Sequence, residues 1–324
     1  MTKKFCYDIT TFGEILIDFT WQGINKEGQA VFAQNPGGAP ANVAVAAAKL
    51  GAHTAFLGKA GKDMHGEFLK EVLKKENVET DGMILDERFF TTLAFVKTAE
   101  NGERSFSFAR KPGADTRIEK NEINTAILDQ TRIFHVGSLS LTDQPARDTT
   151  FYAVKRAKEN SSILSYDPNY RASLWKNEET AKEQMRSLIP YVDIMKISDE
   201  ETELLTGKEK PEEAAEILFQ KGVKIVAVTL GSEGAYLYCK EGGIQVPGFA
   251  SRAVDTNGAG DSFWGGFLYC ISKAGKSPEM FGIEELKEYV RFGNAVASLC
   301  VEKKGAIPAM PTLEEVEKKR HCSF

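Results

Sequence analysis

The sequence contains no long hydrophobic run. Among its 324 residues, no window approaches the roughly 18 consecutive apolar residues that a membrane-spanning helix needs. The N-terminal stretch MTKKFCYDITTFGEILIDF lacks the apolar segment of a secretory signal peptide and is typical of an early β-strand. We therefore expect no membrane segment and a cytoplasmic protein.

Cysteine and histidine are scarce, with 5 and 4 residues respectively. They are scattered along the chain, and no CxxC, HExxH or comparable spacing occurs. An odd number of separated cysteines is typical of reduced, buried thiols in the cytosol. Without closely spaced Cys and His ligands, a structural zinc site is not predicted.

Basic residues are not in excess. The chain carries 41 Lys and Arg against 46 Asp and Glu, which gives a net charge of −5. No stripe of basic residues alternates with aromatic ones, the pattern that marks a nucleic-acid-binding surface. We do not expect nucleic acid as a partner.

Three common phosphate-binding signatures are missing. The segment AGKS resembles the end of a P-loop, but Cys270 occupies the position that requires glycine. No GxGxxG follows a predicted strand, which excludes the dinucleotide fingerprint. The protein-kinase motifs are also absent. Any phosphate chemistry must therefore reside in another glycine-rich segment.

What the chain does contain is an alternation of short apolar strands with amphipathic helices. Strands are predicted at 7–12, 54–58, 132–137, 162–167, 193–198 and 224–230, with a further strand pair at 246–250 and 251–256. Helices are predicted at 63–76, 144–159, 178–189 and 211–221, and a buried apolar helix at 262–272. The alternation predicts an α/β fold with a mostly parallel sheet that helices cover on both faces.

Two regions, 14–36 and 90–111, interrupt this alternation because they contain strands without helices between them. The segment ENGE at 100–103 separates two alternating stretches and predicts a hairpin turn. We expect a small antiparallel sheet outside the main layer, either a lid or a decorated edge. No internal repeat or linker divides the chain, so residues 1–324 are predicted to form one domain with this sheet attached.

The segment AVDTNGAGDSFWGGF carries the strongest chemical signal. Gly258 and Gly260 allow consecutive backbone N–H groups to face one anion at the start of a helix. Asp261 beside them suits a general base, because a carboxylate repels an anion but accepts the proton of a hydroxyl. A helix cap is the alternative role for Asp261.

Two further segments place polar side chains beside a glycine turn or a strand end. In NPGGAPANVAVAAAKLGA, Gly37 and Gly38 let the backbone approach a ligand, and the amide of Asn42 suits sugar hydroxyls. Close packing of a helix explains the small residues equally well, but not the Asn. In DPNYRASLW, Arg171 follows a strand at the edge where open α/β sheets bind ligands. An isolated Arg is also typical of a surface.

Together, these segments resemble the signature patterns of the ribokinase-like (PfkB-type) carbohydrate kinases, and within them the fructokinases. The matching segments are FGEILIDF (12–19), GGAPANVAVAAAKLGA (37–52), GKAGKDMHG (58–66), SYDPNYRASLW (165–175), KISDEE (196–201), VTLGSEGA (228–235), DTNGAGDSF (255–263), FGNAVASL (292–299) and KKGAIPAMP (303–311). The resemblance implies a three-layer α/β/α ribokinase-like core, a lid, and ATP-dependent phosphorylation of a sugar primary hydroxyl, with D-fructose becoming fructose 6-phosphate. Kinases of ribose, 2-keto-3-deoxygluconate or a riboside are the alternative.

The resemblance also implies roles for individual residues. Asp261 would deprotonate the hydroxyl, and the amides of Gly258, Ala259 and Gly260 would hold the transferred phosphate. The expected substrate contacts are Asp18, Gly37, Gly38, Asn42, Arg110 and Arg171, with Arg110 coming from the lid. The expected nucleotide contacts are Ser198, Thr229, Gly231, Gly234 and Asn294. Glu201 would organise Mg²⁺ through water, and Asp255, Asn257, Cys300, Lys303 and Gly305 would hold K⁺.

Two positions depart from the family pattern. Asn257 replaces the second Thr of the usual DTTGAGD, which keeps a backbone-carbonyl role but can shift the turn. Ser198 replaces the Asn of the NxxE motif, so Mg²⁺ would be held more through water. A non-catalytic sugar-binding protein on this scaffold would be expected to lose the base or the glycines, and both are present. The apolar alternation of the lid also suits pairing with a second copy as a homodimer.

Overall fold

The computed structural model describes residues 5–98 and 104–321, and its largest feature is one 10-stranded sheet. The strands are β1 (Tyr7–Phe12), β4 (Thr54–Gly61), β5 (Val78–Glu79), β6 (Met83–Asp86), β9 (Thr131–Val136), β10 (Ile163–Tyr166), β11 (Ile194–Ser198), β12 (Ile225–Thr229), β13 (Ala235–Cys239) and β14 (Gly242–Val246). Their order is β14-β13-β12-β11-β10-β9-β1-β4-β5, with β6 also paired to β4. Strand β13 pairs antiparallel with both β12 and β14, and the other pairings in this sheet are parallel, so the predicted mostly parallel sheet is confirmed.

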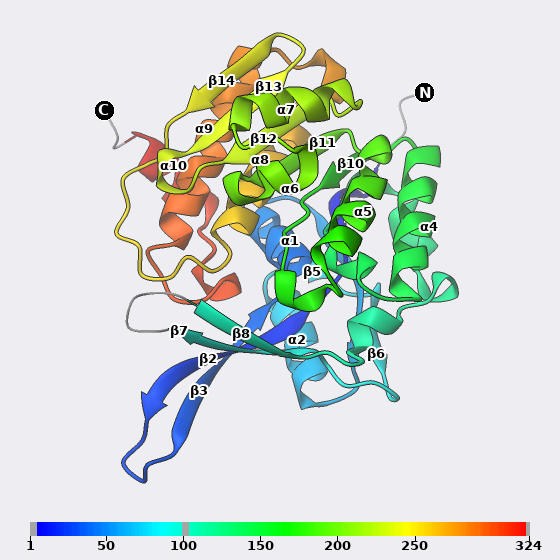
Figure 1. Ribbon diagram of the computed structural model, residues 1–324, viewed down its shortest axis with the longest axis vertical. Helices are drawn as coiled ribbons and strands as arrows, with labels where there is room; N and C mark the ends of the chain where they lie inside the picture. The colour runs from blue at the N-terminus through cyan, green and yellow to red at the C-terminus, as the bar shows by residue number, and fades with distance from the viewer. Residues whose placement is uncertain (1–4, 99–103, 322–324) are drawn as a thin grey trace.

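Helices cover both faces of this sheet, which gives three layers (Figure 1). One face carries α1 (Ala39–Lys49), α8 (Ala259–Ala274) and α9 (Ile283–Cys300), and the other carries α4 (Ala146–Glu159), α5 (Glu178–Leu188) and α7 (Pro211–Gln220). The remaining helices are α2 (Met64–Lys75), α3 (Thr125–Leu128), α6 (Thr202–Thr206) and α10 (Leu313–His321). Each helix predicted from the sequence corresponds to one of these.

The central strands of the main sheet are buried on both faces, as parallel sheets require, whereas the edge strand β14 is partly exposed. The sequence IVAVT of β12 has four fully buried residues, and β4 is buried along its whole length. On one face, α8 packs closely against α1: a Cβ at Gly265 would lie 2.6 Å from the Cβ of Ala46. The small residues of α1 therefore serve a helix–helix contact, and this contact brings Asn42 next to the start of α8.

A second sheet, here called the lid sheet, lies outside the main sheet (Figure 1). It consists of β2 (Leu16–Ile24), β3 (Ala30–Gly37), β7 (Leu93–Thr98) and β8 (Arg104–Ala109), in the order β3-β2-β7-β8. The pairs β2–β3 and β7–β8 are antiparallel, and a parallel pairing of β2 with β7 joins the two hairpins. The predicted hairpin turn at 100–103 lies outside the described residues.

The predicted strand pair at 246–250 and 251–256 is wrong. Strand β14 ends at Val246, and residues 247–257 form neither strand nor helix. Pro247 offers no N–H to a neighbouring strand, and a Cβ at Gly248 would lie 2.6 Å from the carbonyl oxygen of Ser232. This irregular segment carries the chain from the sheet edge to the glycine-rich start of α8.

Candidate active site

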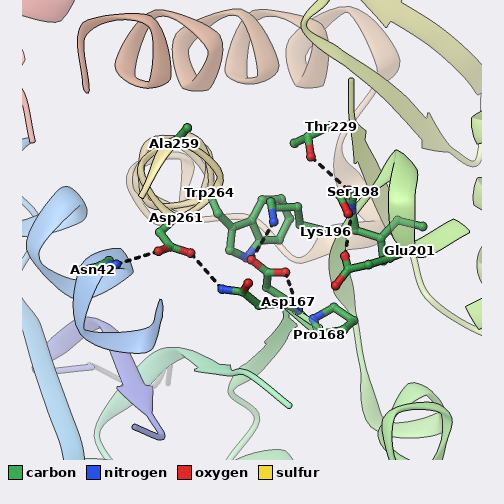
Figure 2. A network of polar contacts seen from close by, with 12 residues as sticks. Asn42, Asp167, Pro168, Lys196, Ser198, Glu201, Thr229, Ala259, Asp261 and Trp264 are labelled. Atoms are coloured by element: carbon green, nitrogen blue, oxygen red, sulfur yellow. Dashed lines mark hydrogen bonds and ion pairs between the residues drawn. The ribbon is translucent and has the colours of Figure 1, made fainter. Parts of the chain in front are cut away.

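Asp261 lies in the first turn of α8, and the residue is 7% exposed. Oδ2 accepts a hydrogen bond from Nδ2 of Asn42 at 2.7 Å, and Oδ1 accepts one from Nδ2 of Asn169 at 3.4 Å. Figure 2 shows the carboxyl of Asp261 facing Asn42 of α1; Asn169 comes from the loop after β10. Since Gly258 is the N-cap residue of α8, the carboxyl of Asp261 faces tertiary partners rather than capping the helix.

The surroundings of Asp261 make it a stronger base than an ordinary aspartate. Burial and the nearby charge of Asp167 raise the pKa of Asp261 to about 6, although Asn42, Lys196 and Arg171 oppose this rise. At neutral pH the carboxyl is therefore ionised, yet it binds a proton more readily than an exposed carboxyl. This combination suits general-base catalysis.

The glycine-rich start of α8 has the geometry of an anion site. Gly258 has φ +75°, a left-handed conformation, and a Cβ there would lie 2.7 Å from the Cβ of Ala306. The first N–H groups of a helix have no partners within it and form its positive end. The N–H of Ala259 donates to the carbonyl of Thr256 at 3.3 Å. Of the three predicted amides, those of Gly258 and Gly260 are therefore the better placed for an anion.

A buried ion pair that the sequence did not predict lies beside this loop. Nζ of Lys196 donates to Oδ2 of Asp167 at 2.7 Å, and the residues are 5% and 1% exposed. Burial alone would lower the pKa of Lys196, but Asp167 and Glu201 raise it above its usual range, so the ammonium is charged. A Cβ at Gly260 would lie 3.2 Å from this Nζ. Positive charge therefore adjoins the anion loop (Figure 2).

One cavity joins Asp261 to the predicted sugar contacts. It is lined by Glu14, Leu16, Asp18, Gly38, Ala39, Asn42, Phe108, Leu139, Asn169, Arg171, Asn257, Gly258, Asp261 and Ala306. Gly38 has φ +109°, and a Cβ there would lie 2.5 Å from the carbonyl oxygen of Glu14. A Cβ at Gly37 would collide with the carboxylate of Asp18. The glycine pair therefore lets the chain pass close to Glu14 and Asp18 at this side of the cavity.

The two predicted arginines lie in different places. Arg171 lines the cavity and donates through Nη1 to the carbonyl of Tyr170 at 3.0 Å. Arg110 is 6% exposed and lines a neighbouring cavity instead. Its Nη2 lies 2.6 Å from Oδ2 of Asp115, and it also donates to the carbonyl of Leu139 at 2.9 Å. Its guanidinium is thus held next to Leu139, which lines the cavity of Asp261.

The predicted nucleotide contacts gather along one end of the main sheet. Ser198 and Thr229 end β11 and β12 and face each other in register, and Gly231 follows with φ +57°. A Cβ at Gly234 would collide with the carbonyl of Val246, so this glycine permits a close turn. Asn294 on α9 donates through Nδ2 to the carbonyls of Val246 and Pro247 at 3.2 and 3.0 Å, which fixes the loop after β14.

Glu201 lies next to this row and is 5% exposed. Its Oε1 accepts from the N–H of Tyr170 at 2.7 Å, and Oε2 accepts from the N–H of Ser198 at 2.8 Å. Burial and Asp167 raise the pKa of Glu201, whereas Lys196 lowers it. No group of three or more His, Cys, Asp or Glu residues that could hold a metal occurs in the part of the chain that the structure describes.

The predicted potassium residues converge at the base of the anion loop. Oδ1 of Asp255 accepts from the N–H of Asn257 at 3.0 Å, and Oδ2 accepts from the N–H of Gly305 at 3.0 Å. Sγ of Cys300 lies 4.0 Å from the carbonyl oxygen of Asn257. Lys303 turns its side chain to Glu315, with 3.0 Å between Nζ and Oε1, so only its backbone remains available to a cation.

Comparison with known proteins agrees with this geometry. A model of the pfkB family carbohydrate kinases matches residues 7–313. The chain belongs to this family. Within it, this kinase is 42% identical over 313 residues to probable fructokinase-5 of Arabidopsis thaliana, which covers 96% of each chain.

Solved structures extend the comparison to the fold. Fructokinase from Xylella fastidiosa with bound ATP matches this kinase with a TM-score of 0.90 and 35% identity, covering 98% of this chain and 100% of the other. A fructokinase double mutant from Vibrio cholerae O395, in a form that binds fructose, ADP and potassium, has a TM-score of 0.86 and 32% identity, covering 96% and 97%. The predicted family and three-layer fold are therefore confirmed.

Several residues in or beside the kinase cavity were not predicted. Asp167 directly follows β10, at the sheet end where ligands of open α/β sheets bind, so that rule could have found it. Lys196 lies within β11 and is found only through its pairing with Asp167. Asn169 adopts φ +46°, a conformation that Asn tolerates better than most residues, and it lies within the DPNYR motif. Glu14 and Phe108 reach the cavity through the lid sheet and its connection, and no local pattern marks them.

Proposed function

We propose that this kinase transfers the γ-phosphoryl group of ATP to the C6 hydroxyl of D-fructose, giving fructose 6-phosphate and ADP. One observation carries the proposal: the buried carboxylate of Asp261 adjoins the glycine-rich start of α8 and opens into the cavity of the predicted sugar contacts. The identity of the sugar draws support from the Arabidopsis relative named as a fructokinase and from the Vibrio cholerae structure with fructose and ADP.

In the proposed reaction, Asp261 removes the proton of the attacking hydroxyl. As the new oxygen–phosphorus bond forms, the bond from the γ-phosphorus to the bridging oxygen breaks, and ADP leaves with that electron pair. Asn42 holds Oδ2 at 2.7 Å, whereas Asn169 is 3.4 Å from Oδ1. The proton therefore goes to Oδ1, the less engaged oxygen.

The developing negative charge on the phosphoryl group faces positive groups. The N-terminus of α8 supplies the positive end of the helix dipole, and the ammonium of Lys196 adjoins Gly260. Arg171 lines the cavity and stabilises the ionised form of Asp261. Such preorganised charge lowers the barrier of phosphoryl transfer more than it strengthens ground-state binding.

Mg²⁺ and K⁺ fit the residues present. Both carboxylate oxygens of Glu201 already accept backbone N–H groups, so their remaining lone pairs suit a water of the Mg²⁺ shell. Mg²⁺ would neutralise the phosphates of ATP. The turn that Asp255 holds through Asn257 and Gly305 would offer backbone carbonyls to K⁺.

We assign the other predicted residues under the same proposal. Asp18, Gly37, Gly38, Asn42 and Arg171 would contact the sugar, and Ser198, Thr229, Gly231, Gly234 and Asn294 would contact the nucleotide. Arg110 would support the wall of the sugar site through Asp115 and Leu139. The whole chain, 1–324, would act as one sugar-kinase domain.

The test is an ADP-release assay across fructose, ribose, 2-keto-3-deoxygluconate and a nucleoside, each with and without K⁺. We expect kcat/KM for fructose to exceed that of every other sugar by about ten-fold or more, with a higher rate when K⁺ is present. A ten-fold higher kcat/KM for another sugar, equivalent to about 1.4 kcal/mol, would overturn fructose as the substrate. It would not overturn the proposal that the chain phosphorylates a sugar. Calorimetric sugar binding without ATP turnover would overturn the kinase itself.

We also propose a homodimer through the lid sheet. Trp21, Phe32 and Phe95 lie on the face opposite Asp18, because neighbouring residues of a strand alternate between faces. These aromatic side chains are 36–38% exposed, and Phe32 meets Phe95 at 5.8 Å between ring centroids. Light scattering across a concentration series is expected to give twice the chain mass, and Phe32→Ser to give the monomer mass. A monomer at every wild-type concentration would contradict the proposal.

A cytoplasmic location is a further proposal. Cys6, Cys239, Cys270 and Cys300 are all free thiols, as in reducing compartments. Within residues 5–98 and 104–321, no helix has the length and apolarity to cross a bilayer. Imaging of a fluorescent fusion is the test, and signal confined to an organelle would contradict the proposal.

A further inference from the structure

Glu14 lies between the last residue of β1 and the first residue of β2, where the chain passes from the main sheet to the lid sheet. It is 3% exposed and lines the same cavity as Asp261 and Asn42. An acidic side chain this buried normally has its oxygens paired. The partners of its two oxygens are therefore informative.

The two carboxyl oxygens of Glu14 differ. Oε1 accepts the N–H of Ala39 at 3.0 Å, at the first residue of α1. Oε2 is buried and has no hydrogen-bond partner among the described residues. The Oδ1 atom of Asn42 is buried without a partner in the same way. Both residues line the cavity, so each brings to its wall a buried acceptor that a hydroxyl donor of a ligand would satisfy.

Glu14 and Asp261 contact α1 at residues that lie about one helical turn apart. Glu14 binds the N–H of Ala39, and Asp261 binds the side chain of Asn42, three residues later. Three residues rise about 4.5 Å along a helix. The contact of Glu14 with α1 thus lies about 4.5 Å along the helix axis from the contact of the base Asp261. Glu14 therefore reaches a different part of the sugar from the hydroxyl that is phosphorylated.

The charged groups around Glu14 are Arg110 and Asp115. Burial raises the pKa of Glu14 to about 7, and Arg110 opposes this rise. Arg110 is already paired with Asp115 at 2.6 Å, and its guanidinium makes no hydrogen bond to Glu14 within the described structure. The carboxyl is thus held close to a positive group while one oxygen stays available to a ligand.

We propose that Glu14 is a sugar-recognition residue whose Oε2 accepts a hydrogen bond from a hydroxyl remote from the phosphorylated one. The proposal rests on the proposed function, because it takes a sugar as the occupant of the cavity. Oε1 meanwhile ties the lid connection to α1. Glu14 thereby discriminates between sugars by requiring a hydroxyl at one position.

The experiment is a cycle between one enzyme variant and substrates that each lack one hydroxyl. Glu14→Gln keeps an oxygen for the N–H of Ala39 but replaces the other oxygen with an amide nitrogen, which cannot accept. Calorimetry measures binding of fructose and of its singly deoxygenated analogues to both enzymes. Glu87→Gln is the matched control, because Glu87 pairs with Lys62 at an exposed site away from the residues that line this cavity.

For wild-type enzyme at about pH 8, above the raised pKa of Glu14, removal of one remote hydroxyl is expected to weaken binding about ten-fold or more, as for a hydrogen bond to a charged group. Glu14→Gln should bind fructose about ten-fold more weakly, bind that analogue no more weakly than fructose, and keep the wild-type KM for ATP. Glu87→Gln should behave as wild type. If each analogue lost the same binding affinity relative to fructose in wild type and in Glu14→Gln, the proposal would be overturned, and Glu14 would have only a structural role.

Two further measurements keep the test decisive. If Glu14→Gln does not fold, Glu14→Asp enters the same cycle, since its shorter side chain withdraws the carboxyl. A crystal structure of wild type with sugar bound is expected to place a hydroxyl within about 3 Å of Oε2, and a sugar with no oxygen there would overturn the proposal. Failure of the proposed function appears separately, as absent fructose turnover by wild type, and the cycle then uses the sugar that is phosphorylated.

Discussion

The two walls of the sugar cavity are built differently. On the core wall, Asp261, Asn42 and Lys196 are at most 7% exposed and belong to a buried polar network with Asp167. On the lid sheet, aromatic side chains such as Phe32, on the face away from Asp18, are more than a third exposed. The groups that must hold a proton acceptor in place are buried on both sides, whereas the sheet that closes the other side of the cavity has one face open to solvent.

The largest expected effect comes from the core wall. Asp261→Asn removes the proton acceptor while keeping the size of the side chain, so kcat should fall by about 10²–10⁴. KM for the sugar should change only a few-fold, since Asn42 and the other residues of the cavity remain. Steady-state kinetics measure both values, and circular dichroism controls for folding. A kcat near the wild-type value would exclude Asp261 as the base. It would also contradict the view that the buried core wall carries the catalytic group.

The next effect concerns the stability of the core wall. Lys196→Met would leave Asp167 as an uncompensated buried charge, which costs about 3–5 kcal/mol of unfolding free energy. Urea unfolding measures this loss. The double variant Lys196→Met/Asp167→Asn should recover part of it, because neither charge remains. Strictly additive losses would mean that the pair is not coupled.

The pH dependence sharpens the same comparison. Asp261 faces Asp167, Lys196 and Arg171, and its pKa is raised to about 6 by burial and by Asp167. We expect kcat/KM to fall about ten-fold per pH unit below pH 6. An aspartate with an ordinary pKa would still be ionised just below pH 6, so a fall that begins there points to a raised pKa. Since the folded-state pKa is raised, the stability linked to this group is present at low pH and lost as pH rises through about 6. A flat profile from pH 4 to 7 would contradict the assignment.

The smallest expected effect comes from the lid sheet. Trp21→Ala in dilute protein should change the unfolding free energy by less than about 1 kcal/mol, because the side chain is 36% exposed. Its matched counterpart is Trp264 of α8, which is fully buried and donates to Oγ of Ser165 at 2.9 Å. Trp264→Ala should cost about 3–5 kcal/mol. Similar losses for both variants would mean that the lid sheet is packed as firmly as the core.

The sequence predicted the central parallel strands because their apolar runs, such as IVAVT in β12, are long enough to be distinctive. It did not predict β5, which has two residues, or the edge strand β14, which begins with two glycines. Short edge strands depend on their neighbours more than on their own composition. The strand pair predicted before α8 was wrong for the converse reason, since an apolar stretch with Pro247 had no partner to pair with.

Within the site, residues in motifs with a local pattern were predicted, whereas the charged pair of Lys196 and Asp167 was not. Gly258, Asp261 and Asn42 lie in segments with a local pattern. Lys196 and Asp167 are 29 positions apart and meet only because β10 and β11 run side by side. Arg110 was predicted to contact substrate, but its position depends on Asp115, which no motif marks. Contacts between residues far apart in the sequence can be predicted only after the order of the strands in the sheet is known.

The register of the lid sheet has a mechanical consequence. Leu16 pairs with Gly37, Ile17 with Leu93, and Leu93 with Ala109, so all four strands join the rest of the chain at the same end. A sheet attached along one row can tilt as a plate but cannot open one strand at a time. With about 3.3 Å per residue, the nine residues of β2 make a lever of about 30 Å, so a few degrees of rotation at its base become ångströms of travel at its tip.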